Sequence, residues 1–174
     1  KVLKSKKNLI IIDSTNLKEK HNETHKSVNS GVLYQTFNSY KITKSEITLV
    51  SKKKSSSKTL EDLIFAYKVA KHVKSNAIVL ANKKQTLGIG AGQMNRVDST
   101  KIAIMKYKQF FNYRSFVCAS DAFFPFTDSI QRLLKLYCSS IIQPRGSIND
   151  KKIISYVNKK NASLYFIKNR VFKH

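Results

Sequence analysis

The sequence predicts an α/β fold in which a mixed or parallel sheet is packed between helices on both faces. Short apolar runs of strand length alternate with longer segments in which apolar residues recur at helical spacing. This alternation is typical of a sheet that carries helices on both of its faces. The chain has 174 residues, of which 41% are hydrophobic, and this is enough for one sizeable core. We therefore expect one compact unit.

Residues 1–57 are predicted to form ragged N-terminal strands and loops. Three short apolar runs are strand candidates: NLIIID (Asn8–Asp13), GVLYQ (Gly31–Gln35) and EITLV (Glu46–Val50). The first is expected to be buried, and the polar residues that follow it to about Lys26 indicate a loop. The run SKKKSSSK at 51–58 is predicted to be a solvated connection.

Residues 58–174 carry the regular alternation of helices and strands. The clearest helix begins at Thr59, which has capping-box spacing with Asp62, and runs to about Val73. Its apolar positions recur at helical spacing: Leu60, Leu63, Ile64, Tyr67 and Ala70. AIVLA (Ala77–Ala81) and TLGIG (Thr86–Gly90) follow as two strands joined by a polar turn. A second helix candidate then carries Val97, Ile104 and Met105.

The last third of the chain continues the same pattern. Three strands are predicted here: FVCAS (Phe116–Ser120), SIIQ (Ser140–Gln143) and SLYFI (Ser163–Ile167). The helix between the first two is marked by Ile130, Leu133, Leu134 and Tyr137. The helix between the last two is marked by Ile153, Ile154 and Val157, and Ser147 and Asp150 have capping-box spacing at its start.

The formal net charge of +23 suggests nucleic-acid binding, but the kind of basic residue argues against it. Among 33 basic residues, the arginines are Arg96, Arg114, Arg132, Arg145 and Arg170, and the rest are lysines scattered along the chain. Arginine is the residue that makes bidentate contacts with phosphates and bases. We therefore expect no nucleic-acid partner, although a basic surface would concentrate anionic small substrates.

The apolar runs and cysteines exclude other classes. No run approaches the roughly 18 apolar residues of a membrane span, and the apolar run near the N-terminus is too short for a signal-peptide core. We expect a cytoplasmic protein without a membrane partner. Cys118 and Cys138 lie in apolar surroundings without CxxC spacing, so we expect buried, reduced thiols rather than a zinc site or a disulfide.

Ligands of open α/β sheets bind beyond the carboxyl ends of the strands, and unusual residues gather at such positions here. Four stretches stand out: KSN (74–76), GIGAGQMNR (88–96), SDAFFPF (120–126) and RVFKH (170–174). Gly88, Gly90 and Gly92 would let backbone N–H groups approach an anion at a helix start, or they serve turn geometry alone. The aromatic loop is either core or a platform for a flat ligand, with carboxylates beside it. The spacing of the histidines predicts no catalytic triad and no zinc site.

Taken in order, five strings resemble the C-terminal part of the AICAR transformylase family: KHVKSNAIVLA, GIGAGQMNRVDSTKIA, ASDAFFPF, IIQPRGSINDKKII and RVFKH. The resemblance extends from GVLYQ to the last residue. It implies a cytidine-deaminase-like layered sheet without the deaminase zinc. It also implies formyl transfer from 10-formyltetrahydrofolate, as co-substrate, to the 5-amino group of AICAR in purine biosynthesis. Family members are homodimers and also carry IMP cyclohydrolase.

The resemblance assigns roles to residues of this chain. Asn76 matches the asparagine beside the transferring formyl group, where an amide donor stabilises a developing oxyanion, and His174 matches a terminal histidine near the active site. The positions that hold AICAR are matched by Arg96, Phe123 and Arg170. The folate pocket is matched by Val97, Pro125, Phe126 and Asp128. A monovalent cation, potassium in particular, would lie at Ser75, Asp121 and the backbone near Val171.

The chain departs from the family pattern in the turn 143–150. Where the family has QPGGSIRD, this chain has Arg145 in place of a turn glycine and Asn149 in place of an arginine. A side chain in a left-handed turn is strained, so we expect strain at Arg145.

The family's Lys-His pair, which accepts the proton, is expected upstream of this chain, and Lys71-His72 is not that pair. Three interpretations stay open. The chain is the inactive C-terminal portion of a transformylase, one subunit of a split enzyme, or a decayed remnant that binds nucleotide or RNA without catalysis.

Overall fold

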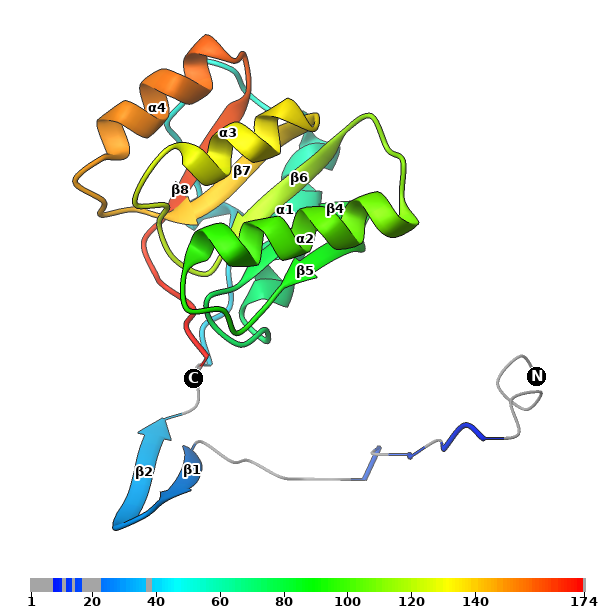
Figure 1. The fold of residues 1–174 in the computed structure, drawn as a ribbon, viewed down its shortest axis with the longest axis vertical. Coiled ribbons are helices and arrows are strands. Elements are labelled where there is room, and N and C mark those ends of the chain that lie inside the picture. Colours follow the sequence, from blue (N-terminus) through cyan, green and yellow to red (C-terminus); the bar gives the residue numbers. More distant parts are fainter. Residues whose placement is uncertain (1–7, 11, 14, 17–22, 37–38, 174) are drawn as a thin grey trace. The chain divides into compact units, whose positions relative to one another are not determined.

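The computed structural model describes residues 8–10, 12–13, 15–16, 23–36 and 39–173. Its contacts divide the chain into two units, Lys1–Ser39 and Tyr40–His174. The second unit is built on a six-stranded mixed sheet with the strand order β3-β8-β7-β6-β4-β5 (Figure 1). The predicted α/β class, with a mixed sheet, is therefore confirmed.

The strands and helices of the second unit follow the predicted alternation. The strands are β3 (Thr48–Leu49), β4 (Ile78–Asn82), β5 (Gln85–Gly90), β6 (Phe116–Ser120), β7 (Cys138–Pro144) and β8 (Ser163–Ile167). The helices are α1 (Ser57–Ala70), α2 (Arg96–Phe110), α3 (Asp128–Lys135) and α4 (Asp150–Lys159). Strands β6, β7 and β8 are parallel, whereas β4 is antiparallel to both β5 and β6. Ile78 at the start of β4 pairs with Ser120 at the end of β6, so these two ends share one edge of the sheet.

The core forms two layers, one on each face of the sheet. Alternate residues of a strand point to opposite faces, so Ile78 and Leu80 join one layer and Val79 and Ala81 join the other. The first layer lies under α2, α3 and α4, and the second lies under α1 (Figure 1). Helices therefore cover both faces, as the sequence predicts.

Two glycines of β5 allow α2 to pack closely on the sheet. A Cβ atom at Gly88 would lie 2.1 Å from the carbonyl oxygen of Ala103, and one at Gly90 would lie 1.8 Å from that of Ser99. The predicted strand-to-helix turn, whether it serves an anion or turn geometry alone, does not include Gly88 and Gly90, because both are strand residues paired with β4. Gly92 does lie in the turn before α2, with a φ of 65°.

The start of α1 differs from the predicted capping box. The side chain of Ser56 accepts a hydrogen bond from the N–H of Thr59 at 3.2 Å, so the helix begins one residue after Ser56. The carboxylate of Asp62 instead accepts bonds from the N–H groups of Lys83 and Lys84. The acidic side chain therefore holds the β4–β5 turn, which sequence spacing does not reveal.

Two other boundaries are shorter than predicted. Tyr137 lies beyond α3, is 65% exposed and has a φ of 68°. Of the predicted strand Glu46–Val50, only Thr48–Leu49 pairs with β8, because a 3-10 turn at Lys44–Glu46 precedes it.

The first unit consists of a hairpin and an irregular segment. Strands β1 (Glu23–Val28) and β2 (Gly31–Thr36) pair antiparallel, and every residue of both is exposed. The strand predicted at Gly31–Gln35 is therefore confirmed, but the loop predicted to about Lys26 is wrong where β1 begins.

The buried strand predicted at Asn8–Asp13 is also wrong. Its described residues form no strand, and Ile10 and Ile12 are 86% and 80% exposed. An apolar run becomes a buried strand only where another strand and a covering layer meet it, and none of the described residues pairs with this run.

Both cysteines are free and buried, as predicted. Burial raises the pKa of Cys138 to about 12 and raises that of Cys118 as well. Neither thiol is therefore a nucleophile at neutral pH. Within the described part of the chain, no helix combines the length and apolarity needed to cross a membrane.

Candidate functional site

Arg96 is the centre of a buried polar network at one edge of the sheet. It is the first residue of α2 and is only 8% exposed. One terminal nitrogen of its guanidinium, Nη2, forms an ion pair with Asp121 Oδ1 at 2.8 Å. Its Nε donates to the hydroxyl of Ser120, and its Nη1 donates to the side-chain carbonyl of Asn76, both at 2.9 Å. One side chain thus joins α2, the end of β6 and the segment before β4.

Asn76 is held at both ends of its side-chain amide. The oxygen Oδ1 accepts from Arg96, and Nδ2 donates to the backbone carbonyl of Gln93 at 2.8 Å. The backbone carbonyl of Asn76 accepts from the hydroxyl of Ser99 at 2.7 Å. The bond between Ser75 and Asn76 is a cis peptide. Because Nδ2 carries two hydrogens, one N–H remains for a ligand.

Asp121 connects this network to the C-terminal segment. Its carboxylate is fully buried, and Oδ2 accepts from the hydroxyl of Ser75 at 2.6 Å. Its backbone carbonyl accepts from the N–H of Val171 at 3.1 Å, and the Ser75 hydroxyl accepts from the N–H of Lys173. Burial lowers the pKa of Arg96 while Asp121 opposes that shift. The guanidinium stays protonated, so a buried charge pair anchors the edge.

Arg170 and Phe123 form a second contact at this edge. The guanidinium carbon of Arg170 lies 4.8 Å from the ring centroid of Phe123, a cation–π arrangement. Phe123 is half-buried in the loop after β6, while Arg170 follows β8. A stacked guanidinium keeps N–H groups in its plane for an anion.

The four residues predicted to line a folate pocket lie at or just before the starts of two neighbouring helices. Val97 lies in the first turn of α2, Asp128 begins α3, and these helices contact each other. Pro125 and Phe126 precede α3, and Phe126 is 63% exposed. Its ring is therefore an apolar surface that no described residue covers.

The turn 145–149 accommodates both departures from the family pattern. Arg145 is not among the non-glycine residues with positive φ, so the expected strain at that position is absent. Gly146 adopts the left-handed conformation instead, with a φ of 112°. Asn149 donates to the carbonyl of Pro125 at 2.7 Å, so it supports the aromatic loop.

The carboxylate of Asp150 accepts from the N–H groups of Gly146 and Ser147, so it reaches back as in a capping box. The Ser147 hydroxyl accepts from the N–H of Asn149 rather than from the N–H of Asp150, so only half of the predicted box forms.

The structure brings most of the predicted site residues to one edge. Hydrogen bonds, an ion pair and a ring contact join the following: Ser75, Asn76, Arg96, Asp121, Phe123 and Arg170. His174 lies outside the described residues. Among the residues that are described, no three His, Cys, Asp or Glu side chains cluster as a metal site would require.

Sequence reasoning missed three residues that hold this site. The hydroxyl of Ser120 accepts from Arg96 and donates to the carbonyl of Ala122, while Ser99 and Gln93 hold the backbone and side chain of Asn76. Serine and glutamine carry no distinctive spacing signal. A serine at the end of a buried strand, as Ser120 is, was the available hint.

Comparison with known proteins identifies relatives of this chain. A family model described as the AICARFT/IMPCHase bienzyme matches residues 1–106. The bifunctional purine biosynthesis protein PurH of Wigglesworthia glossinidia brevipalpis is 44% identical over 173 residues, which are 99% of this chain and 33% of that protein. The PurH protein of Caldicellulosiruptor bescii is 46% identical over 175 residues, again 99% of this chain and 33% of the relative. The chain thus spans about a third of the length of the curated relatives it matches.

Proposed function

The chain belongs to the AICARFT/IMPCHase bienzyme family, and we propose that it supplies substrate-binding residues for formyl transfer from 10-formyltetrahydrofolate to the 5-amino group of AICAR. The reaction is one step of purine biosynthesis, the process for which its PurH relatives are named. In the whole protein we expect a homodimer. The observation that carries the proposal is the fixed amide of Asn76.

Asn76 would donate its remaining N–H to the formyl oxygen. The amine of AICAR attacks the formyl carbon, and negative charge develops on that oxygen as the tetrahedral centre forms. The centre then collapses, the bond to the folate nitrogen breaks, and that nitrogen receives a proton while the amine loses one, so that tetrahydrofolate leaves. A donor that is already oriented stabilises this charge without reorganisation. The bonds from Asn76 to Arg96 and Gln93 supply that orientation. The role of Arg96 toward AICAR itself remains the prediction made from the resemblance.

Arg170 and Phe123 would bind the nucleotide. A guanidinium suits a phosphate because its N–H groups match phosphate oxygens in pairs. The stacking of Arg170 on Phe123 restricts the guanidinium before ligand binds, so less conformational entropy is lost on binding.

The exposed ring of Phe126, with Pro125 and Val97, would form the apolar wall for the flat ring system of the folate. The carboxylate of Asp128 would accept from its ring N–H groups.

Ser75 and Asp121 would hold the monovalent cation. Both present oxygen atoms, which are the ligands that hard cations prefer, and the Ser75 hydroxyl can turn its proton away from Asp121. Such an ion would add local positive charge beside the buried carboxylate. His174 remains a predicted catalytic residue.

A chimeric enzyme tests the proposal. This chain would replace the third of the Wigglesworthia protein that it matches, and tetrahydrofolate release would be followed with AICAR and 10-formyltetrahydrofolate. We expect Asn76→Ala to lower kcat by about 10²–10³-fold, the loss typical of removing one oxyanion donor. Asn82→Ala is the matched control, because that amide bonds to the carbonyl of Ser115 near the opposite end of β4. Equal activity in the two variants would exclude the proposed role of Asn76.

A second candidate function is binding without catalysis. The departures at Arg145 and Asn149 favour it, since both lie in the turn that supports the aromatic loop. A folded chimera that binds AICAR and folate in calorimetry but releases no tetrahydrofolate would support this function over formyl transfer.

A further inference from the structure

A cavity of about 580 Å³ lies against α1, on the other face of the sheet from α2, α3 and α4. Its floor is apolar and buried: Ile42, Tyr67 and Val171 are 8%, 1% and 1% exposed. The remaining lining residues form its rim: Tyr40, Lys41, Thr43, Lys68, Lys71 and His72. The volume lies within the range of about 300–1,000 Å³ that small-molecule sites occupy.

The rim is basic, and none of the described residues that line the cavity is acidic, although Glu46 beside this lining interacts with Tyr40. Lys41, Lys68 and His72 are exposed, and within the described residues neither of these two lysines forms an ion pair. Lys71 has a structural task, because its ammonium donates to the carbonyl of Tyr40 at 2.8 Å and fastens the cavity wall to α1. The apolar floor and cationic rim therefore match an anion attached to an apolar body.

The negative end of the α1 dipole favours Lys68, which lies in the last turn of the helix, but Lys41 lies outside the helix. Backbone N–H groups already satisfy the last carbonyls of the helix, such as that of Tyr67, which accepts from Lys71 N–H. The carbonyl of His72 accepts from the ammonium of Lys173, which is not a rim residue. The positive charge of Lys41 is thus not accounted for by the helix end.

The cavity floor is joined to the segment that carries Arg170. The hydroxyl of Tyr67 donates to the carbonyl of Asn169 at 2.5 Å. The N–H of Val171 donates to the carbonyl of Asp121, the partner of Arg96. A ligand that packs on Tyr67 and Val171 would therefore restrict the backbone on both sides of Arg170.

We propose that this cavity binds a small organic anion with an aromatic or apolar body, such as an aromatic carboxylate, sulfonate or phosphate. Its binding strengthens the binding of AICAR, because it orders the segment 169–171 that presents Arg170. The first part is independent of the proposed function, and only the coupling rests on it. Coupling between two sites is reciprocal, so AICAR strengthens the binding of the anion by the same factor.

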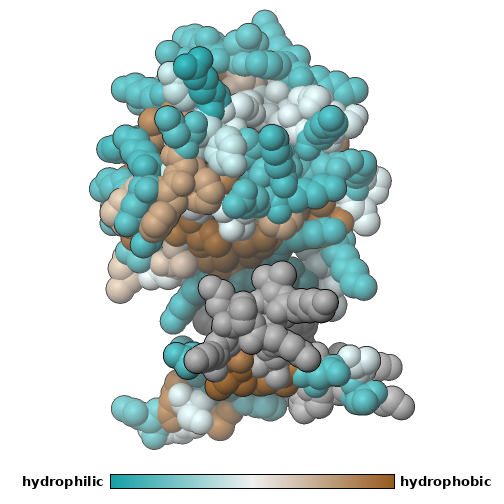
Figure 2. Space-filling model, turned by 90° about the vertical axis from the view of Figure 1, so that its right-hand side faces the viewer, coloured by the Kyte–Doolittle hydropathy of each residue, from teal (hydrophilic) through white to brown (hydrophobic). Residues whose placement is uncertain are grey.

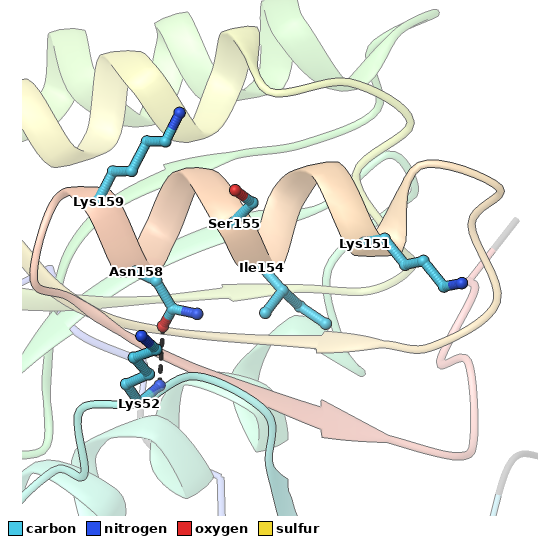
Figure 3. Close-up of a pocket in the computed structure, with 6 residues that line it drawn as sticks. All are labelled: Lys52, Lys151, Ile154, Ser155, Asn158 and Lys159. Atoms are coloured by element: carbon cyan, nitrogen blue, oxygen red, sulfur yellow. Dashed lines mark hydrogen bonds between the residues drawn. The ribbon is translucent and has the colours of Figure 1, made fainter.

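A second basic groove provides the matched comparison. It lies along α4 and is lined by Lys52, Lys151, Ile154, Ser155, Asn158 and Lys159. In Figure 3 the ammonium groups of its three lysines point in different directions, so they do not converge on one anion. Hydrophilic side chains also cover much of the face shown in Figure 2, and the chain has 33 lysines and arginines, so positive charge alone does not mark a site on this chain.

The test uses 8-anilinonaphthalene-1-sulfonate as the probe, an aromatic sulfonate whose binding to the purified chain is followed by fluorescence and calorimetry. We expect the double variant Lys41→Glu/Lys68→Glu to weaken binding roughly tenfold or more. Lys151→Glu/Lys159→Glu makes the same change of net charge on α4 and should alter binding less than about twofold. All four lysines are exposed, so both variants should keep the fold. An equal loss in the two variants would show nonspecific attraction and overturn the proposal.

Two further measurements separate this cavity from the proposed AICAR site. Arg170→Ala should abolish AICAR binding and leave probe binding within about twofold, whereas probe loss in this variant would place the probe at the wrong site. Saturating probe should tighten AICAR binding about fivefold or more, the lower end of typical coupling. Unchanged AICAR affinity would overturn the coupling. A chimeric enzyme that binds the probe but not AICAR would contradict the proposed function and leave the anion site supported.

Discussion

Short strands rich in apolar residues occur in both units of this chain, but they are exposed in one unit and buried in the other. Strand β2 of the hairpin and strand β4 of the sheet are both short and rich in apolar residues. Every residue of β2 is exposed, whereas Ile78–Ala81 of β4 are fully buried. The difference is that β4 lies between β5 and β6 with helices on both faces, while β2 pairs with β1 alone. A strand pattern therefore predicts extended backbone, and only the surrounding layers determine burial.

The comparison also locates the source of stability. A two-stranded hairpin is at best marginally stable by itself, because it has no second layer to remove its apolar side chains from water. Val32, Leu33 and Tyr34 are 62%, 58% and 57% exposed. The free energy of unfolding should thus come from the unit Tyr40–His174, and paired substitutions can test this.

The largest difference in the free energy of unfolding is expected when one leucine of each unit is replaced by alanine. Leu80→Ala in β4 leaves a cavity in a fully buried layer and should cost about 2–5 kcal/mol. Leu33→Ala in β2 removes an exposed side chain and should change stability by less than about 0.5 kcal/mol. Urea denaturation followed by circular dichroism measures both. A comparable loss at Leu33 would mean that the hairpin is covered in solution.

Replacing one glycine of each unit by alanine tests how closely the two units are packed. Gly90→Ala would place a Cβ atom 1.8 Å from the carbonyl oxygen of Ser99, so α2 must move away from β5. Overpacking of this kind costs about 1–3 kcal/mol. A Cβ atom at Gly31 in the hairpin would meet nothing within 4 Å, so Gly31→Ala should be nearly neutral. Thermal melts of the two variants measure the difference, and similar melting temperatures would contradict the packing described for Gly90.

The smallest expected effect is a change in how the free energy of unfolding depends on pH. Burial raises the pKa of Cys138 to about 12, whereas an unfolded thiol titrates near 8.5. Between these values the folded state holds a proton that the unfolded state releases, so stability falls as pH rises above about 8.5.

Cys138→Ala should reduce this fall by about 1 kcal/mol between pH 8.5 and pH 9.5. Denaturation curves at the two pH values provide the measurement, with the exposed hairpin variant Leu33→Ala as the control that keeps the wild-type slope. An unchanged slope in the cysteine variant would show that this thiol ionises as readily in the folded state.

Local patterns in the sequence were sufficient to predict most strands and helices of the second unit. Strands β4 to β8 and the helices between them follow from apolar runs and helical spacing, because those signals act within a few residues. The burial of both cysteines was also predicted correctly. The resemblance to a family then selected residues that the structure brings to one edge of the sheet.

Only the tertiary structure decided which side chains meet. Arg96 reaches Ser120, Asp121 and Asn76, which lie on other elements of the chain, and no spacing rule joins them. The close packing at Gly90 and the bonds from Asp62 to the β4–β5 turn also arise from elements folded against each other. The sequence by itself determined the order and type of the elements in the second unit, because these depend on local periodicity. Burial, hydrogen-bond partners and the site geometry depend on contacts between distant residues, which only the folded chain creates.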